Sequence, residues 1–541
     1  MSTGGGGAAA VGDGDTFDYV VVGAGSAGCV LAARLSEDPG TTVLVLEAGP
    51  PDRHPFVHVP AAFPRLFGGR LDWDLVTVPQ PGLGGRTVHW PRGRVVGGSS
   101  SLNAMMWLRG GPADYDSWTA VAGPGWSWAS VLPYFRRAED WSSGAGPDRG
   151  SGGPIPVQPL VDPNPLTAAF VAAARNAGFP DSVPAGGPVV EGVATTPVNQ
   201  RRGRRVSAAD AYLKPALRRP NCALRTGAAV RAVRFDGRRA VGVAYRAGGT
   251  DRLARARREV LLAAGAIGSP QLLLCSGVGP AQALQALGIP VVADRPAVGT
   301  GLADHLASGI AVSSRAPITL TGATSPRALA RYLARRRGPL TSNVAEAVAF
   351  VRSSPAAEAP DLELVFLPVP FLDEGRRMPT EHGVSLAAVL LQPASRGTVT
   401  LAHPDPAVPA RIDPAYLSDP EGADATLLAD GVRHCQALLA TEPLAGALGD
   451  VLAPAGRTGE GAVEAAVRDL SQTLYHPAGT CAMGTAPGSV TDPDGRVRGV
   501  AGLRVIDASI LPRLVRGHTH APTVMVAERL ADALRGRSAP S

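Results

Sequence analysis

Apolar residues near the start of the chain follow the order strand, glycine turn, helix, strand. Residues 17–22 form an apolar, β-branched run that predicts a buried strand. The motif GAGSAG over 23–28 follows at once, and an Ala/Leu-rich stretch over 29–35 continues as a helix. A second apolar run over 42–46 ends in Glu47. The pattern predicts a complete βαβ unit.

The glycines of this motif suit the binding of a dinucleotide. Gly23 permits the tight turn, Gly25 lets the backbone approach a pyrophosphate, and Gly28 lets the helix pack closely on the strand. Free N–H groups at the helix N-terminus would face the phosphates. Glu47, about twenty residues further on, would accept a hydrogen bond from a ribose hydroxyl. The unit therefore predicts dinucleotide binding, and it does not distinguish NAD from FAD.

A second glycine-rich stretch, RGRVVGGSSSLNAMMWLRG, spans residues 92–110. Gly97 and Gly98, the three serines after them and Asn103 make a flexible turn rich in hydrogen-bond donors. Such a turn could lie against a second part of a flat cofactor, and an ordinary Gly/Ser loop is the alternative.

Residues 258–280 predict a strand, a glycine turn and a short helix, with Ser269 as its N-cap and Pro270 at its first position. Over residues 154–221 and again over 306–488 the βα rhythm gives way to mixed helices and alternating strands.

The end of the chain again predicts a buried strand over residues 502–512, a loop and a long helix after Ala521. We therefore expect two interleaved architectures, with the C-terminus returning to complete the first domain.

Composition and charge narrow the class of protein. Hydrophobic residues make up 45% of the chain and charged residues 18%, the profile of a globular enzyme. The formal net charge is +6, but the densest basic run, Arg201 to Arg205, lacks the interleaved aromatic residues of a nucleic-acid surface. We expect no nucleic-acid partner.

Cysteine usage and the N-terminus point to the cytoplasm. The 5 cysteines are odd in number and form no CxxC motif, so neither a disulfide framework nor a zinc site is expected. Residues 1–15 lack the basic and apolar regions of a signal peptide and predict a short disordered leader. No apolar window is long enough for a transmembrane helix.

Two histidines stand one residue apart in RGHTHAP, residues 516–522. In an extended segment His518 and His520 would share a face, as half of a metal site or as a base aimed into a pocket. His54, His58 and His89 lie in loop-like stretches, His305 belongs to the GLADH turn and His434 to a predicted helix. No HxxxH with a third carboxylate is found, so no metal is expected. No GxSxG elbow supports a serine hydrolase.

Taken together, these motifs resemble the glucose-methanol-choline (GMC) oxidoreductases. RGRVVGGSSSLNAMMWLRG, GAIGSPQLLLCSGVGP, PAVGTGLADH, SRGTVTLA, HPAGTCAMG and VRGVAGLRVIDASILP follow the opening βαβ unit in that family's order, and the resemblance runs over about 17–534. The chain looks most like the choline-dehydrogenase-like and hydroxymethylfurfural-oxidase-like bacterial alcohol oxidoreductases.

The resemblance implies an α/β fold, in which a Rossmann-like FAD-binding domain is interleaved with an α+β substrate domain on a mostly antiparallel sheet. The FAD-binding domain is expected over residues 16–155, 222–310 and 489–535, and the substrate domain over 156–221 and 311–488.

The same resemblance implies which residues bind FAD. The set is Gly23, Gly25, Gly28, Glu47 and Ala48 at the ADP half, Gly97, Gly98, Ser101 and Asn103 along the pyrophosphate and flavin, Val230 near the adenine, and Asp507, Ala508 and Thr523 at the ribityl and ring end. Choline oxidases that bind flavin covalently carry a histidine where this chain has Leu102. FAD is therefore expected to bind non-covalently.

Alcohol oxidation removes a proton from oxygen and a hydride from carbon. Flavin N5 takes the hydride, and histidine is the base that needs the least tuning near neutral pH. The family pattern places the base on His476 and a His or Asn on the position of His520, which would stabilise the alkoxide. His518 is interpreted as a supporting or solvent-facing side chain.

The resemblance predicts an FAD-dependent oxidase or dehydrogenase of a small-molecule, primary alcohol. A hydroxynitrile lyase on the same fold and a catalytically inactive flavoprotein are the alternatives. The electron acceptor, oxygen or a quinone or other redox carrier, is left open. The apolar stretch LVFLPVPFLDEG favours a nonpolar or aromatic alcohol over a cationic one such as choline.

Overall fold

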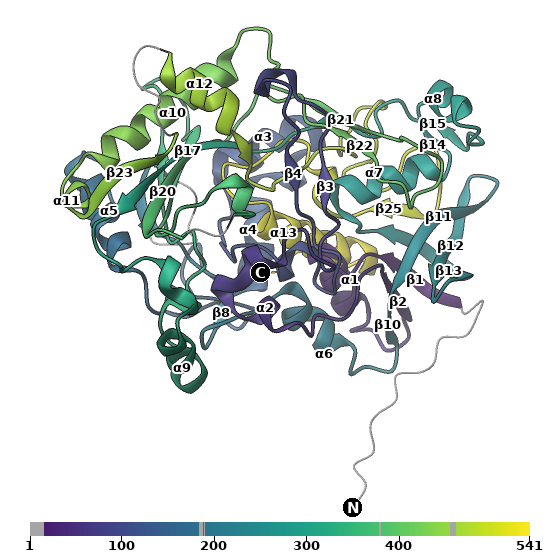
Figure 1. The fold of residues 1–541 in the computed structure, drawn as a ribbon. Coiled ribbons are helices and arrows are strands. Elements are labelled where there is room, and N and C mark those ends of the chain that lie inside the picture. Colours follow the sequence, from purple (N-terminus) through teal and green to yellow (C-terminus); the bar gives the residue numbers. More distant parts are fainter. Residues whose placement is uncertain (1–15, 183–187, 189, 378–379, 455–460, 541) are drawn as a thin grey trace, which may run out of the picture.

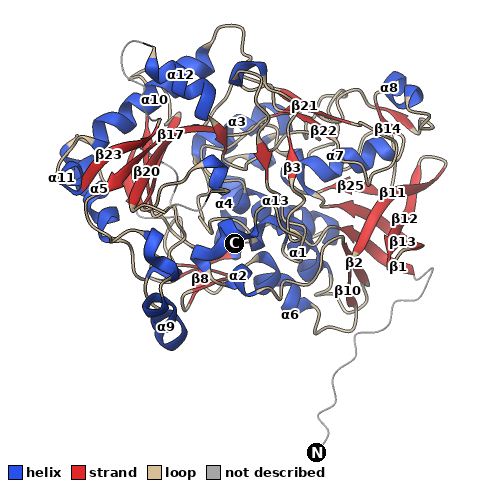
Figure 2. Ribbon diagram, viewed as in Figure 1, coloured by secondary structure: helices blue, strands red, loops and turns tan. Residues whose placement is uncertain are grey.

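The computed structural model describes residues 16–540, except 183–187, 189, 378–379 and 455–460. The predicted leader over 1–15 lies outside the described residues. Two sheets form the cores of two halves, one around β1 and β13 and the other around β17 and β20 (Figures 1 and 2).

The first sheet has the order β10-β2-β1-β13-β12-β11. β25 pairs with the C-terminal part of β13, on the side opposite β1. Its strands are β1 (Thr16–Val22), β2 (Val43–Glu47), β10 (Cys222–Thr226), β11 (Ala228–Asp236), β12 (Arg239–Ala247), β13 (Thr250–Leu262) and β25 (Leu503–Val505). β10, β2, β1, β13 and β25 run parallel, whereas β12 and β11 form an antiparallel extension. The predicted βαβ unit is confirmed, and its buried apolar strands suit the centre of a parallel sheet.

The C-terminal helix returns to the first helix, as predicted. α1 (Ser26–Leu35) packs against α13 (His520–Arg535), although they lie at opposite ends of the chain. Arg34 donates from Nε and Nη2 to Glu528, at 2.8 Å each, and the Glu528 side chain is fully buried. This pairing fixes the start of α13, where the two histidines of the RGHTHAP stretch lie.

The short helix predicted after Ser269 begins earlier than expected. α7 spans Gly265–Cys275, with Pro270 inside it. Ser269 is therefore no N-cap. Its Oγ instead donates to the carboxylate of Asp507 at 2.6 Å. This long-range contact overrides the local capping pattern.

The second sheet is antiparallel, with the order β23-β17-β20-β19-β18-β7, and β24 also pairs with β17. Its strands are β7 (Gly192–Thr195), β17 (Leu306–Ser314), β18 (Ala347–Val351), β19 (Leu362–Leu367), β20 (Gly383–Leu390), β23 (Leu448–Ala453) and β24 (Gln472–Thr473). α5 (Pro165–Asn176) and α10 (Ala423–Leu439) pack against it. The predicted domain boundary at residue 310 falls inside β17.

The remaining helices and strands lie outside the two large sheets. The helices are α2 (Pro55–His58), α3 (Pro112–Ala122), α4 (Trp128–Ala138), α6 (Lys214–Ala216), α8 (Ala281–Ala286), α9 (Pro326–Arg335), α11 (Leu444–Ala447) and α12 (Ala462–Leu470). The strands are β3 (Leu75–Val76), β4 (His89–Trp90), β5 (Glu139–Trp141), β6 (Ile155–Val157), β8 (Gln200–Arg201), β9 (Arg204–Arg205), β14 (Val278–Gly279), β15 (Ala293–Asp294), β16 (Thr300–Leu302), β21 (Gly397–Thr400) and β22 (Arg411–Asp413). No helix of the described residues is long and apolar enough to cross a bilayer.

Gly28 is the tightest point of the βαβ turn. A Cβ at this position would lie 1.9 Å from the carbonyl oxygen of Gly23. We expect Gly28→Ala to lower the free energy of unfolding by about 1–3 kcal/mol or more, because the helix must move off the turn. Denaturant unfolding measures the loss. Gly488→Ala is the control, since a Cβ there meets no described atom within 4 Å; equal losses in both variants would contradict the prediction.

Candidate active site

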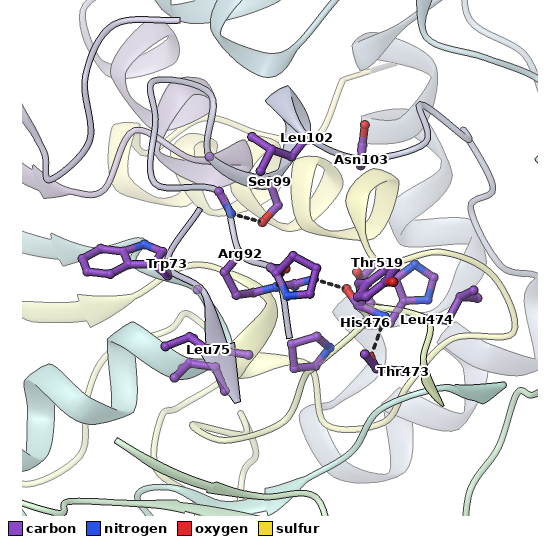
Figure 3. Close-up of a pocket in the computed structure, with 18 of the residues that line it drawn as sticks. Trp73, Leu75, Arg92, Ser99, Leu102, Asn103, Thr473, Leu474, His476 and Thr519 are labelled. Carbon is purple, nitrogen blue, oxygen red and sulfur yellow. Dashed lines mark hydrogen bonds between the residues drawn. The ribbon is translucent and has the colours of Figure 1, made fainter. Parts of the chain in front are cut away.

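One large cavity runs from the glycine turn of the βαβ unit to a cluster of histidines. Its volume is about 960 Å³, and residues from both sheets line it. Figure 3 shows part of its wall, where Thr519 and Leu474 lie beside His476, and Leu102 and Asn103 lie farther along the wall.

The two glycine-rich motifs touch at one end of the cavity. The amide N–H of Gly97 donates to the carbonyl oxygen of Ala24 at 2.7 Å. A Cβ on Gly98, whose φ is +54°, would lie 2.7 Å from the Cα of Gly25. Among the described residues, no side chain caps the N-terminus of α1. The first N–H groups of this helix are thus available to an anionic group in the cavity.

Glu47 lies at the same end, as the ribose prediction requires. It is buried, and its two carboxylate oxygens accept from the backbone N–H groups of Ala24 and Gly49, each at 2.8 Å. Burial raises the pKa of Glu47 to about 7. Ala48 and Val230 line the cavity beside it.

The predicted cofactor residues separate into two groups. Those that line the cavity are Gly23, Gly25, Glu47, Ala48, Gly98, Asn103, Val230, Asp507, Ala508 and Thr523, whereas Gly28, Gly97 and Ser101 do not. Ser101 Oγ donates instead to the carbonyl oxygen of Val96 at 2.8 Å. The neighbouring Ser99 and Ser100 line the cavity. Ser101 therefore holds the turn rather than facing the cavity.

Asp507 also has a supporting role. Its carboxylate accepts from Gly265 N at 2.9 Å, Ser269 Oγ at 2.6 Å, and the N and Oγ of Ser509 at 2.8 and 2.6 Å. These bonds connect the start of α7 to the loop after β25. Burial raises the pKa of this carboxyl group.

The residues present fit FAD. The uncapped helix N-terminus and the bare glycine backbones suit a pyrophosphate, and Glu47 suits a ribose. The cavity then continues past Asn103 to the histidines. Leu102 lines the cavity with an aliphatic side chain.

His476 belongs to a buried pair with His305. Nε2 of His305 is 3.1 Å from the carbonyl oxygen of Leu391, and the two Nδ1 atoms of His305 and His476 are 2.9 Å apart. A carbonyl oxygen only accepts, so His305 carries its proton on Nε2 and accepts at Nδ1. His476 therefore donates from Nδ1, and its Nε2 keeps a lone pair. This tautomer is that of a general base.

Burial keeps both imidazoles neutral. The pKa of His476 lies well below its usual value, mainly because burial disfavours the charged ring and further because His518 and His305 lie close. Burial lowers the pKa of His305 to about 3. The backbone N–H of His476 donates to Asp304 Oδ1 at 2.8 Å, which holds the residue in place.

His518, rather than His520, lies beside His476. The ring centroids of His476 and His518 are 4.5 Å apart. Nε2 of His518 is 3.2 Å from Oε1 of Glu363, which is fully buried on β19. His518 is itself buried and lines the cavity, so its interpretation as solvent-facing is wrong.

His520 faces a different part of the cavity wall. Its Nδ1 is 3.0 Å from Ser26 Oγ, and its ring meets Trp107 edge-on with centroids 5.6 Å apart. Its Nε2 is buried without a hydrogen-bond partner among the described residues. Burial lowers the pKa of His520 to about 4.

The two rings separate because the segment is not extended. Thr519 has helical φ and ψ of −74° and −13°, and α13 begins at His520. Residues two apart in such a turn do not share a face. The expected partnership of His476 with His520 therefore has no contact to support it, and the contacts favour His518.

The sequence reasoning missed His305 and Glu363 as functional residues. His305 had been noted only as part of the GLADH turn. Glu363 is the one charged residue in the apolar run LELVFL, which was available as a signal for a buried, paired carboxylate. Its partner is 155 residues away in sequence, so the pairing needed the fold.

Three potential metal ligands also cluster. Ligand atoms of Asp72, Asp74 and His89 lie within 4.8 Å of one another. The Asp72 carboxylate already accepts from the backbone N–H groups of Gly68 at 2.9 Å, Asp74 at 3.1 Å and Arg92 at 2.7 Å. These hydrogen bonds to Asp72 hold the loop that places Arg92 in the cavity wall.

The cavity joins the glycine turn of the βαβ unit to a cluster of buried histidines. Residues 17–307 and 393–527 match the N-terminal and C-terminal family models of the GMC oxidoreductases. The chain belongs to the GMC oxidoreductase family, whose members oxidise CH–OH donors with FAD.

Similar proteins span nearly the whole chain. An uncharacterised GMC-type oxidoreductase of Mycobacterium tuberculosis is 51% identical over 96% of this chain and 99% of its own. Alcohol dehydrogenase [acceptor] of Pseudomonas putida is 41% identical over 95% of both chains. Among solved structures, pyridoxine 4-oxidase from Mesorbium loti has a TM-score of 0.88 and 34% identity, covering 96% of this chain and 100% of its own.

The lowered pKa of His476 predicts the acid limb of the pH profile. A base whose pKa lies below the usual 6.5 is protonated only at lower pH, so it stays active as the pH falls through 6.5. We expect the rate of flavin reduction by a saturating alcohol to stay level through that pH and to fall only well below it. Stopped-flow absorbance measures this rate. A half-loss of rate at pH 6.5 would contradict the prediction.

Proposed function

We propose that this protein oxidises a primary alcohol to an aldehyde, with His476 as the general base and FAD bound non-covalently. FAD, when bound, supplies the acceptor for the hydride. The lone pair on His476 Nε2 carries the proposal, because His305 and Leu391 fix that tautomer from behind. His476 would take the hydroxyl proton of the alcohol as its C–H bond delivers a hydride.

His518 and Glu363 would stabilise the alkoxide. Glu363 would hold His518 through Nε2, and the His518 ring, whose centroid is 4.5 Å from that of His476, would lie beside the substrate oxygen. Preorganised hydrogen bonds to a developing alkoxide lower the barrier most in a buried site. His520 would serve the cofactor side instead, through its unpartnered Nε2 beside α1.

The substrate end of the cavity supports a nonpolar or aromatic alcohol. Apolar side chains line it, and the rings of Phe67 and Tyr475 lie with centroids 5.6 Å apart. Phe63, Val365 and Leu367 also contribute to its wall. Glu363 faces His518 and does not line the cavity; the carboxylates that line its substrate end are Asp373, Glu374 and Asp469.

Re-oxidation takes oxygen or a quinone-type carrier. The cysteines are all free thiols, which suits the reducing cytoplasm.

The resemblance places the substrate domain over residues 156–221 and 311–488. We propose that its second segment begins at the start of β17, because β17 pairs with β20 of the substrate half.

The central test is anaerobic mixing of the purified flavoprotein with a panel of primary alcohols. We expect bleaching of the oxidised flavin by a nonpolar or aromatic alcohol, and acid denaturation should release the flavin into the supernatant. His476→Ala should slow bleaching by about 10² to 10⁴-fold while retaining FAD. The control is His434→Ala, on α10, outside the cavity lining.

Repeating the panel with oxygen and with a dye acceptor then distinguishes an oxidase from a dehydrogenase. An unchanged rate in His476→Ala would remove this residue from the role of base. Oxidised flavin with every alcohol, together with cyanide release from mandelonitrile, would identify a lyase instead.

Glu363→Gln tests the charge beside His518. The amide keeps the shape but removes the negative charge that holds His518 through Nε2, so we expect flavin reduction to slow by roughly 10²-fold with little change in FAD content. Glu346→Gln is the control, because that carboxylate is equally buried but accepts from Thr167, Ser342 and the backbone of Asn164, away from the histidines. Equal slowing in both variants would mean that Glu363 only supports the fold.

A further inference from the structure

Helix α9 (Pro326–Arg335) projects from the body of the protein at the edge of the substrate half (Figure 1). Its sequence is PRALARYLAR, and only Ala328 and Tyr332 are buried. Leu329 and Leu333, one turn apart, are 48% and 63% exposed. These are large apolar side chains in water, beside a cluster of arginines.

The arginines follow the helix in a row. Arg327, Arg331 and Arg335 recur every fourth residue, so they share one side of the helix. The two leucines lie on a different side, and the exposed Ala330 and Ala334 separate the two rows on the outer surface. Arg336 and Arg337 continue the positive charge past the end of the helix. The outer surface of α9 therefore carries an apolar row along one edge and a basic row along the other.

Little negative charge opposes this row. Asp162 pairs with Arg331 at 3.1 Å and with Arg337 at 3.3 Å. Across the residues that the structure describes, Arg327 and Arg335 have no ion-pair partner. The exposed face of α9 consequently carries net positive charge.

We propose that α9 docks on an anionic lipid surface. Leucines beside a row of arginines are the composition of a helix that lies in the membrane interface, with its apolar side chains among the acyl chains and its guanidinium groups at the phosphates. A second copy of this chain would bring two rows of arginine together, which like-charge repulsion opposes. The anionic bilayer satisfies both stripes at once.

Docking would place the substrate cavity next to the lipid. Tyr332, on the buried face of α9, belongs to the same hydrophobic cluster as Phe63 and Val344. Phe63 and Val344 also line the cavity. The side chains that pack on the inner face of α9 therefore also form part of the cavity wall. A nonpolar molecule that leaves the bilayer at α9 would be close to the cavity.

The test is co-sedimentation of the FAD-loaded protein with vesicles of phosphatidylcholine alone or mixed with phosphatidylglycerol. We expect binding to the mixed vesicles that weakens with salt, and little binding to phosphatidylcholine alone. Two double variants, L329S/L333S and R327Q/R335Q, should each bind the mixed vesicles at least about tenfold more weakly. A triple variant, V451S/R218Q/R238Q, removes an exposed apolar residue and two exposed arginines elsewhere and should bind like wild type.

Melting temperature and oxidation of a water-soluble alcohol report whether the α9 variants remain folded. Binding of L329S/L333S equal to wild type, or no binding of wild type to either vesicle, would overturn the proposal. So would a dimer that both α9 variants abolish, because the face would then be an interface between copies. Lipid binding by α9 does not require the alcohol chemistry, so the two proposals can fail separately.

Discussion

The buried carboxylate of Glu528 is the interaction on which the rest of the site depends. Arg34 from α1, Tyr212 and Arg137 all pair with it, at 2.8, 2.7 and 2.6 Å, although they come from three separate segments. Leaving such a charge unpaired would be strongly destabilising, so these partners hold α13 in one position against α1. The start of α13 then fixes Thr519 and both histidines around it.

The histidine site exists only where the two halves meet. His305 and Leu391 come from the second half, and His476 lies on the loop that follows β24. His518 and His520 arrive from the first half at the base of α13. One half supplies the wall that fixes the proton on His476, and the other supplies the wall against which a cofactor lies. Neither sheet contains the chemistry alone.

Local constraints made much of the fold predictable from sequence. The GAGSAG turn can be predicted from sequence because its steric limits act within a few residues. A Cβ on Gly28, for example, would lie 1.9 Å from the carbonyl oxygen of Gly23. The return of the C-terminal strand and helix also followed from their apolar pattern. The predicted start of α7 was wrong because Ser269 hydrogen-bonds to Asp507, 238 residues away in sequence. No local capping rule includes such a contact.

The same contrast separates the histidines. His476 was recognisable from its motif, whereas the choice between His518 and His520 depended on whether the backbone at Thr519 was extended or helical. The backbone conformation of one residue, Thr519, thus decides which histidine ring lies beside His476. The role of Glu363 could not be predicted, because a glutamate in an apolar strand indicates that its carboxylate is buried but not which residue pairs with it.

The contact between Gly25 and Gly98 has a further consequence for assembly of the holoprotein. Because the two glycine motifs form one surface, a nucleotide can be held only after both have reached their native places, together with the final helix. A flavin held there without a covalent bond would act as a folding ligand for the whole chain, and free cofactor at about 1,000 times its dissociation constant would add about 4 kcal/mol to the stability of the native state. A cell short of flavin would accordingly make a protein of lower stability as well as lower activity.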